Sequence, residues 1–142
     1  MASTILQIGN VFSKLGRDLD ALDKYRQALD VFREIYGKKD HSDIATTIKA
    51  IGNIQSKGGD YTAALESYKS ALGMFQSFYN NQPHPSIAST IHSIGNVCNK
   101  SHKHQEALRY YEQALILFRE IYGSNHSELS TTMYSMGGIN NM

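Results

Sequence analysis

Apolar residues recur along the chain in steps of three and four, which is the spacing of one face of an α-helix. Two runs with Gly16 between them fill the first 37 residues: Ile5, Ile8, Phe12 and Leu15, then Leu22, Tyr25, Leu29, Phe32 and Tyr36. The second run returns later as Ala64, Tyr68, Ala71, Leu72 and Phe75, and again as Ala107, Tyr111, Ala114, Leu115 and Phe118. The pattern therefore predicts pairs of amphipathic helices.

A six-residue motif, Ile-x-x-Ile-Gly-Asn, marks the first helix of each pair. Its glycines are Gly9, Gly52 and Gly95, so the motif returns every 43 residues, and a weaker copy follows at residues 133–138. A fixed period of this length indicates stacked repeat units. We predict a single array over residues 1–142, with repeats at 3–37, 44–80 and 87–123 and the first helix of a fourth repeat at 128–142.

Small residues recur on both helices of a pair. Ala21 and Ala28 lie seven residues apart on one side of the second helix. A glycine inside a helix costs about 1 kcal/mol relative to alanine, so its return in each first helix indicates a position where no side chain fits. We expect the two small surfaces to face each other in a tight antiparallel helical hairpin.

Cap residues return at the ends of the predicted helices. Glycine and asparagine accept the left-handed conformation of a C-cap, and one of them follows the last aromatic residue of each second helix: Gly37, Asn80 and Gly123. Serine is a favoured N-cap, and one precedes each following first helix: Ser42, Ser86 and Ser127.

Together, the Ile-x-x-Ile-Gly-Asn motif, a glycine turn and the motif Ala-Leu-x-x-Tyr-x-x-Ala-Leu resemble the tetratricopeptide repeat. The spacing of 42 to 43 residues, with His41, His84 or His126 in each connection, is similar to the long repeats of kinesin light chains and nephrocystin-type proteins. The resemblance implies an all-α fold, a right-handed α-solenoid of stacked antiparallel hairpins. It also implies a protein–protein interaction scaffold with a concave groove lined by the first helices.

The side of the first helices opposite the apolar stripe carries amides and cations, and no Asp or Glu. Its members are Asn10, Asn53 and Asn96, then Lys14, Lys57 and Lys100, then Lys49, His92 and Tyr134. Amides donate and accept hydrogen bonds and lysine attracts carboxylate or phosphate, so we expect this side to bind an extended acidic peptide or a free carboxylate. A second interpretation stays open, in which the amides bond within the stack and the end lysines complement helix dipoles.

The predicted fourth repeat stops without a second helix. Terminal units of a solenoid normally present a polar outer face, whereas this helix carries Met133, Met136 and Ile139. We expect either a fragment of a longer array or a homo-oligomer formed through this face. A regulatory domain that senses a peptide and compacts on binding it is a further alternative to the scaffold.

Composition limits the other functional classes. A formal net charge of +1 gives no bulk attraction to nucleic acid or to an anionic membrane, so neither is expected as a partner. The sequence does not begin with a basic segment followed by an apolar run, and it has no stretch of 18 apolar residues, so we expect neither a signal peptide nor a membrane span. With a single cysteine, Cys98, it is typical of a reducing compartment, and we expect a cytoplasmic protein.

Motifs for catalysis are missing from the sequence: it has no phosphate loop, dinucleotide fingerprint or nucleophile elbow. We therefore expect no enzyme activity and no cofactor. Cys98, His102 and His104 lie near one another, but this spacing matches no zinc pattern, and no metal is expected. Cys98 has the phase of packing residues, which predicts a buried thiol.

Overall fold

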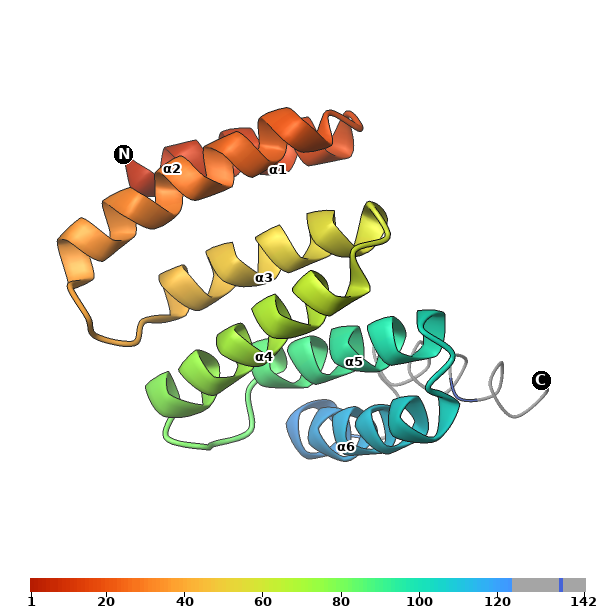
Figure 1. The fold of residues 1–142 in the computed structure, drawn as a ribbon. Coiled ribbons are helices and arrows are strands. Elements are labelled where there is room, and N and C mark those ends of the chain that lie inside the picture. The colour runs from red at the N-terminus through yellow and green to blue at the C-terminus, as the bar shows by residue number, and fades with distance from the viewer. Residues whose placement is uncertain (124–135, 137–142) are drawn as a thin grey trace. The chain divides into compact units, whose positions relative to one another are not determined.

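Figure 1 shows the computed structural model, in which residues 1–123 and Met136 are described. These residues form six α-helices and no strand: α1 (Ala2–Lys14), α2 (Asp18–Tyr36), α3 (Ser42–Lys57), α4 (Tyr61–Phe78), α5 (Pro85–Lys100) and α6 (His104–Tyr122). The chain divides into two compact units, Met1–Phe78 with α1 to α4 and Tyr79–Met142 with α5 and α6. The predicted all-α fold of helical hairpins is confirmed.

In each hairpin the glycine of the first helix packs directly against a tyrosine ring of the second. A Cβ atom added to Gly9, Gly52 or Gly95 would lie 2.7, 2.9 or 2.7 Å from the Cε1 atom of Tyr25, Tyr68 or Tyr111, respectively. Real Cβ atoms do not approach a carbon this closely, and the three rings are buried. The prediction that no side chain fits at the repeated glycine is confirmed, and its cause is the tyrosine ring.

Two alanines that recur in each second helix, seven residues apart, are also buried completely. Their exposed fraction is 0%: Ala21 and Ala28, Ala64 and Ala71, and Ala107 and Ala114. A methyl group allows close approach of the neighbouring helix, so these positions complete the small surface expected from the sequence.

The core of the first unit places α2 against both α1 and α3. Ala21 and Tyr25 of α2 form a buried cluster with Ile51 and Ile54 of α3, and partly buried apolar residues pack against it: Leu6, Phe12, Leu22, Leu29 and Ala50. The second hairpin therefore covers a face of the first, as stacking requires. This packing gives α3 a neighbour on each side.

The apolar stripe predicted for α1 is only partly buried. Ile8 and Leu15 are 41% and 65% exposed, whereas Ile51, which occupies the position of Ile8 in the next repeat, is buried. The physical reason is that α2 covers Ile51, and no described helix of this unit covers the corresponding side of α1. Periodicity alone does not show which copies of the stripe a neighbouring helix covers.

The connections confirm two of the predicted C-caps and correct the predicted N-caps. Gly37 and Gly123 are the C-caps of α2 and α6, with positive φ of 66° and 82°. Asn80 also has positive φ, at 55°, but α4 ends at Phe78, so Asn80 lies in the turn beyond the helix. The N-cap of α3 is His41 rather than Ser42, because the Nδ1 atom of His41 accepts a hydrogen bond of 3.0 Å from the Asp43 amide.

The second connection repeats this arrangement. Nδ1 of His84 accepts from the Ser86 amide at 3.1 Å, so Ser86 is not the N-cap of α5. Each histidine ring also stacks on the preceding tyrosine, with 3.7 Å between centroids for both Tyr36–His41 and Tyr79–His84. Because each imidazole both caps the next helix and stacks on a tyrosine, it fixes the direction in which the chain enters that helix. The predicted cap Ser127 lies outside the described residues.

Replacing His41 with alanine should lower the free energy of unfolding by about 1–3 kcal/mol. The variant loses an N-cap bond, typically worth about 1 kcal/mol, and an aromatic contact worth about 0.5–1.5 kcal/mol. His41→Asn should recover part of the loss, since asparagine caps helices but cannot stack in the same way. Urea unfolding of the two variants measures the difference. Equal stabilities of His41→Ala and His41→Asn would show that the cap contributes nothing.

Candidate functional site

The three repeated asparagines each accept a hydrogen bond from the tyrosine that packs on the neighbouring glycine. The hydroxyl–Oδ1 distances are 2.7 Å for Tyr25–Asn10, 2.5 Å for Tyr68–Asn53 and 2.5 Å for Tyr111–Asn96. The glycine, asparagine and tyrosine of each hairpin therefore form one structural element: the glycine admits the ring, and the asparagine binds its hydroxyl. This supports the interpretation of the amides as bonds within the stack.

The bond to tyrosine occupies the oxygen of each amide and not its nitrogen. Burial raises the pKa of Tyr25, while the Ser13 side chain offsets part of the increase. The phenol thus stays protonated at neutral pH and remains the donor. Asn53 is exposed, and Asn10 and Asn96 are half-buried, so the Nδ2 hydrogens of these amides are the groups available to a ligand.

The lysines at the ends of the first helices differ from one another. Lys14 and Lys100 are exposed and lie in the last turns of α1 and α5. Lys57 instead contacts the first hairpin: its Nζ atom lies 3.3 Å from Oδ1 of Asp18 and 3.4 Å from the Ser13 carbonyl oxygen. Lys57 therefore links the two hairpins of the first unit. Asp18, which belongs to α2, also places a negative charge beside the polar side of the first helices, where the first-helix sequences contain no acidic residue.

Lys49 and His92 occupy the same position in their repeats, and both are half-buried. The ring of His92 lies 5.2 Å from that of Tyr111. Leu6, the corresponding residue of α1, packs against the buried cluster of the first unit. This position of the repeat thus lies at the border between the core and the polar side of the first helices. The sequence pattern places it on the polar side alone.

Several predicted site residues lie outside the described part of the chain: Tyr134 on the binding side, and Met133 and Ile139 on the self-association face. Met136 is helical and half-buried. The binding role of Tyr134 and the self-association face stay predictions.

The cysteine and histidines near the end of α5 have structural contacts. Cys98 is 2% exposed, as expected for a packing residue. Nδ1 of His104 lies 2.9 Å from Oδ1 of Asn99, and His102 has a positive φ in the turn. Within residues 1–123 and Met136, no three side chains of the metal-binding types gather.

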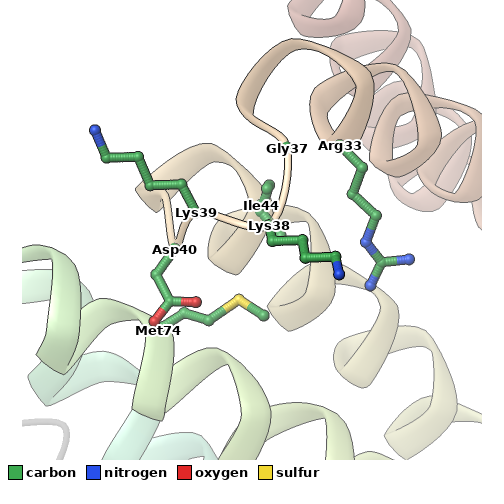
Figure 2. Close-up of a pocket in the computed structure, with 7 residues that line it drawn as sticks. All are labelled: Arg33, Gly37, Lys38, Lys39, Asp40, Ile44 and Met74. Atoms are coloured by element: carbon green, nitrogen blue, oxygen red, sulfur yellow. The ribbon is translucent and has the colours of Figure 1, made fainter.

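A basic pocket at the turn from α2 to α3 was missed by the sequence analysis. It has a volume of about 390 Å³ and is lined by Arg33, Gly37, Lys38, Lys39, Asp40, Ile44 and Met74 (Figure 2). The signal was present in the sequence: Lys38 and Lys39 follow Gly37, whereas the corresponding residues of the second repeat are Asn81 and Gln82. Residues common to all repeats do not reveal this pair of lysines, because the second repeat lacks it.

The paired helices, the glycine–tyrosine contact and the stacked second hairpin define the class: this is a helical-repeat protein. A match to the tetratricopeptide repeat family covers residues 1–77 and 86–142. The chain belongs to the tetratricopeptide repeat family, whose fold serves as a protein–protein interaction scaffold. Among the described residues, no helix is long and apolar enough to cross a membrane.

Solved structures with the same fold include BtubC (BKLC) from P. vanneervenii, with a TM-score of 0.87 and 19% identity over 99% of this chain. A putative kinesin light chain from Podosopora anserina has a TM-score of 0.81 and 14% identity over 96%, and the apo form of RapI has 0.85 and 18% over 99%. This chain spans 55%, 64% and 48% of those proteins, respectively. No curated protein sequence matches it. Such low identities establish the fold alone.

Proposed function

We propose that the chain is a scaffold that binds an extended acidic peptide on the Asn/Lys face, defined here as the polar sides of α1 and α3 with Asn10, Lys14, Lys49 and Asn53. The polar side of α5 carries the same residue types as His92, Asn96 and Lys100. The observation that carries the proposal is the fixed orientation of the amides, whose oxygens are held by tyrosine hydroxyls.

An amide fixed in this way is organised in advance for a peptide. The tyrosine bond holds the asparagine side chain in one orientation, so less conformational entropy is lost when a ligand binds. Its Nδ2 group donates, and the backbone carbonyls of an extended peptide accept. The structural and binding interpretations of the amides are therefore compatible, because they use different atoms of the same side chain.

Charge favours an acidic ligand over a basic one. Lys14 is exposed, and in α1 and α3 the polar sides carry no carboxylate. Lys57 contributes less than the sequence implies, because Asp18 lies 3.3 Å from its ammonium group. Lys14 and Lys49 are the other cations of this face that we propose attract the peptide in the first unit.

The test uses peptides selected on the wild-type protein from a phage-displayed library of random peptides. We expect enrichment of Asp and Glu and an affinity that falls as salt is raised, because exposed charges are screened. Asn53→Asp should weaken the selected peptide by about tenfold or more, since it removes the Nδ2 donors and adds a charge that repels the ligand. Because the aspartate oxygen still accepts from Tyr68, the thermal midpoint should change little.

Lys69→Gln is the matched control, as Lys69 is exposed on α4 and not on the Asn/Lys face. It should change the affinity less than twofold, whereas Lys49→Gln should weaken the peptide several-fold. Selected peptides without acidic enrichment, or equal affinities for the wild type and Asn53→Asp, would contradict the proposal.

A further inference from the structure

The pocket at the α2–α3 turn is built by three helices of the first unit and the connection between two of them. Arg33 lies in the last turn of α2, Lys38 to Asp40 form the connection, and Ile44 and Met74 come from α3 and α4. It is separate from the Asn/Lys face, since Ile44 and Asn53 lie nine residues apart, or roughly 14 Å along the axis of α3. The cavity of about 390 Å³ is of the size that holds a side chain or a small molecule.

The charges of this pocket are not compensated by the protein. Three cations and one carboxylate line it, giving a formal charge of +2. In the described part of the chain, neither Arg33 nor Lys38 forms an ion pair, with Asp40 or with any other residue. In Figure 2, Arg33 and Lys38 extend toward the same side of the pocket, and Lys39 extends in the opposite direction. Two like charges directed to one place repel unless an anion lies between them.

The fold does not require these charges. The Phe-Arg-Glu-Ile-Tyr-Gly segment of residues 32–37 recurs at residues 118–123, but Ser124 and Asn125 then replace the two lysines. In the second repeat, Gln76 replaces the arginine, and Asn81 and Gln82 follow the turn. The positive φ of the turn residue is nevertheless common to Gly37, Asn80 and Gly123. The backbone of the connection is a property of the repeat, whereas the pair Lys38 and Lys39 occurs in this connection alone.

The composition of the pocket selects among anions. Arginine forms paired hydrogen bonds with phosphate oxygens, and lysine adds a point charge. A phosphorylated serine carries a charge of about −1.5 to −2 at neutral pH, which matches the formal charge of the lining better than a single carboxylate does. Ile44 is buried and Met74 is half-buried at the pocket, so apolar contact is available to a neighbouring side chain, and the flexible thioether can adapt to it.

We infer that this pocket is a second binding site, which takes a phosphorylated serine side chain of a protein partner between Arg33 and Lys38. An adjacent apolar residue of the partner would contact Met74. The site lies at the opposite end of α3 from Lys57 and does not depend on the Asn/Lys face.

The probe is a fluorescently labelled, end-capped pentapeptide, Ala-Ala-phosphoserine-Leu-Ala, measured by anisotropy against its unphosphorylated form. The phosphorylated peptide should bind at least tenfold more tightly. Arg33→Gln and Lys38→Gln should each weaken it by about fivefold or more, because each removes a charge-assisted contact. These side chains are exposed, so the thermal midpoint should stay within about a degree of the wild type.

Asp40→Asn supplies a test of opposite sign. Removing the carboxylate from the lining should raise the affinity for the phosphopeptide at least twofold, a gain that damage to the fold would not produce. Lys69→Gln is the matched control, because it removes one positive charge from an exposed side chain that does not line the pocket, and it should change the affinity less than twofold.

The outcomes that overturn the inference are distinct. They are equal binding of the two peptides, no binding of either, a loss of affinity with Asp40→Asn, or unchanged affinity with both Arg33→Gln and Lys38→Gln. The affinity for glycerol phosphate is the remaining measurement. If glycerol phosphate binds as tightly as the phosphopeptide, the pocket takes small organic phosphates and the peptide assignment fails. Asn53→Asp should not alter the phosphopeptide affinity, so this test and that of the Asn/Lys face can fail separately.

Discussion

Gly95→Ala should lower the free energy of unfolding by about 1–3 kcal/mol, although alanine is the better helix former. The new Cβ atom would lie 2.7 Å from Cε1 and 2.8 Å from Cδ1 of Tyr111. That ring is 1% exposed, and its hydroxyl is bonded to Asn96, so it cannot move aside without breaking other contacts. Overpacking of this kind costs about 1–3 kcal/mol, which exceeds the gain of nearly 1 kcal/mol in helix propensity. Chemical denaturation measures the change.

Gly73→Ala is the matched control for this substitution. Gly73 lies within α4, and a Cβ atom added there meets no other atom within 4 Å. The same change of residue should therefore stabilise the protein by about 0.5–1 kcal/mol. If the two substitutions had effects of the same sign, the contact between glycine and tyrosine would not be the reason for the repeated glycine.

Asn96→Ala should cost about 1–2 kcal/mol of stability, even before any ligand is considered. The substitution removes the acceptor that Oδ1 of Asn96 provides to the Tyr111 hydroxyl at 2.5 Å. The bond is part-buried, so its loss should cost less than the upper end of the roughly 1–3 kcal/mol given for an unsatisfied buried group, and alanine offsets several tenths of a kcal/mol through its helix propensity. Thermal and urea unfolding should both show the loss, in contrast with the neutral effect expected if the amide contacted only a ligand.

A double-mutant cycle with Tyr111→Phe separates this bond from other effects of the substitution. If the two side chains are coupled, the double variant should be more stable than the sum of the single changes implies, by about 1 kcal/mol. Additive losses would mean that the bond does not stabilise the hairpin. Asn96→Asp keeps the acceptor and removes the donors, so it should retain the coupling with Tyr111.

The expected loss of stability in the alanine variants also determines how peptide binding by this chain can be tested. Substitution of the asparagines by alanine changes stability and ligand contacts together, so a loss of binding would have two explanations. The aspartate variants keep the bond to tyrosine, and a loss of binding would then be attributable to the amide nitrogen. The orientation of the asparagine side chain therefore determines which substitution is informative.

The sequence by itself determined the repeat and the helices. A 43-residue period, steps of three and four between apolar residues and recurrent caps are local signals, and each follows from the geometry of one helix or one turn. For the same reason the glycine position could be predicted to be crowded. The buried thiol of Cys98 followed from its phase alone.

Only the tertiary structure decided what the polar side chains contact. Asn10 and Tyr25 are 15 residues apart in the chain, and Lys57 and Asp18 are 39 residues apart; no periodicity along one helix encodes either pair. The N-cap role of His41 required the position of its ring on Tyr36. The exposure of Ile8 and the charged pocket at Arg33 and Lys38 likewise depend on which helices pack together, because burial and electrostatic environment are properties of several elements at once.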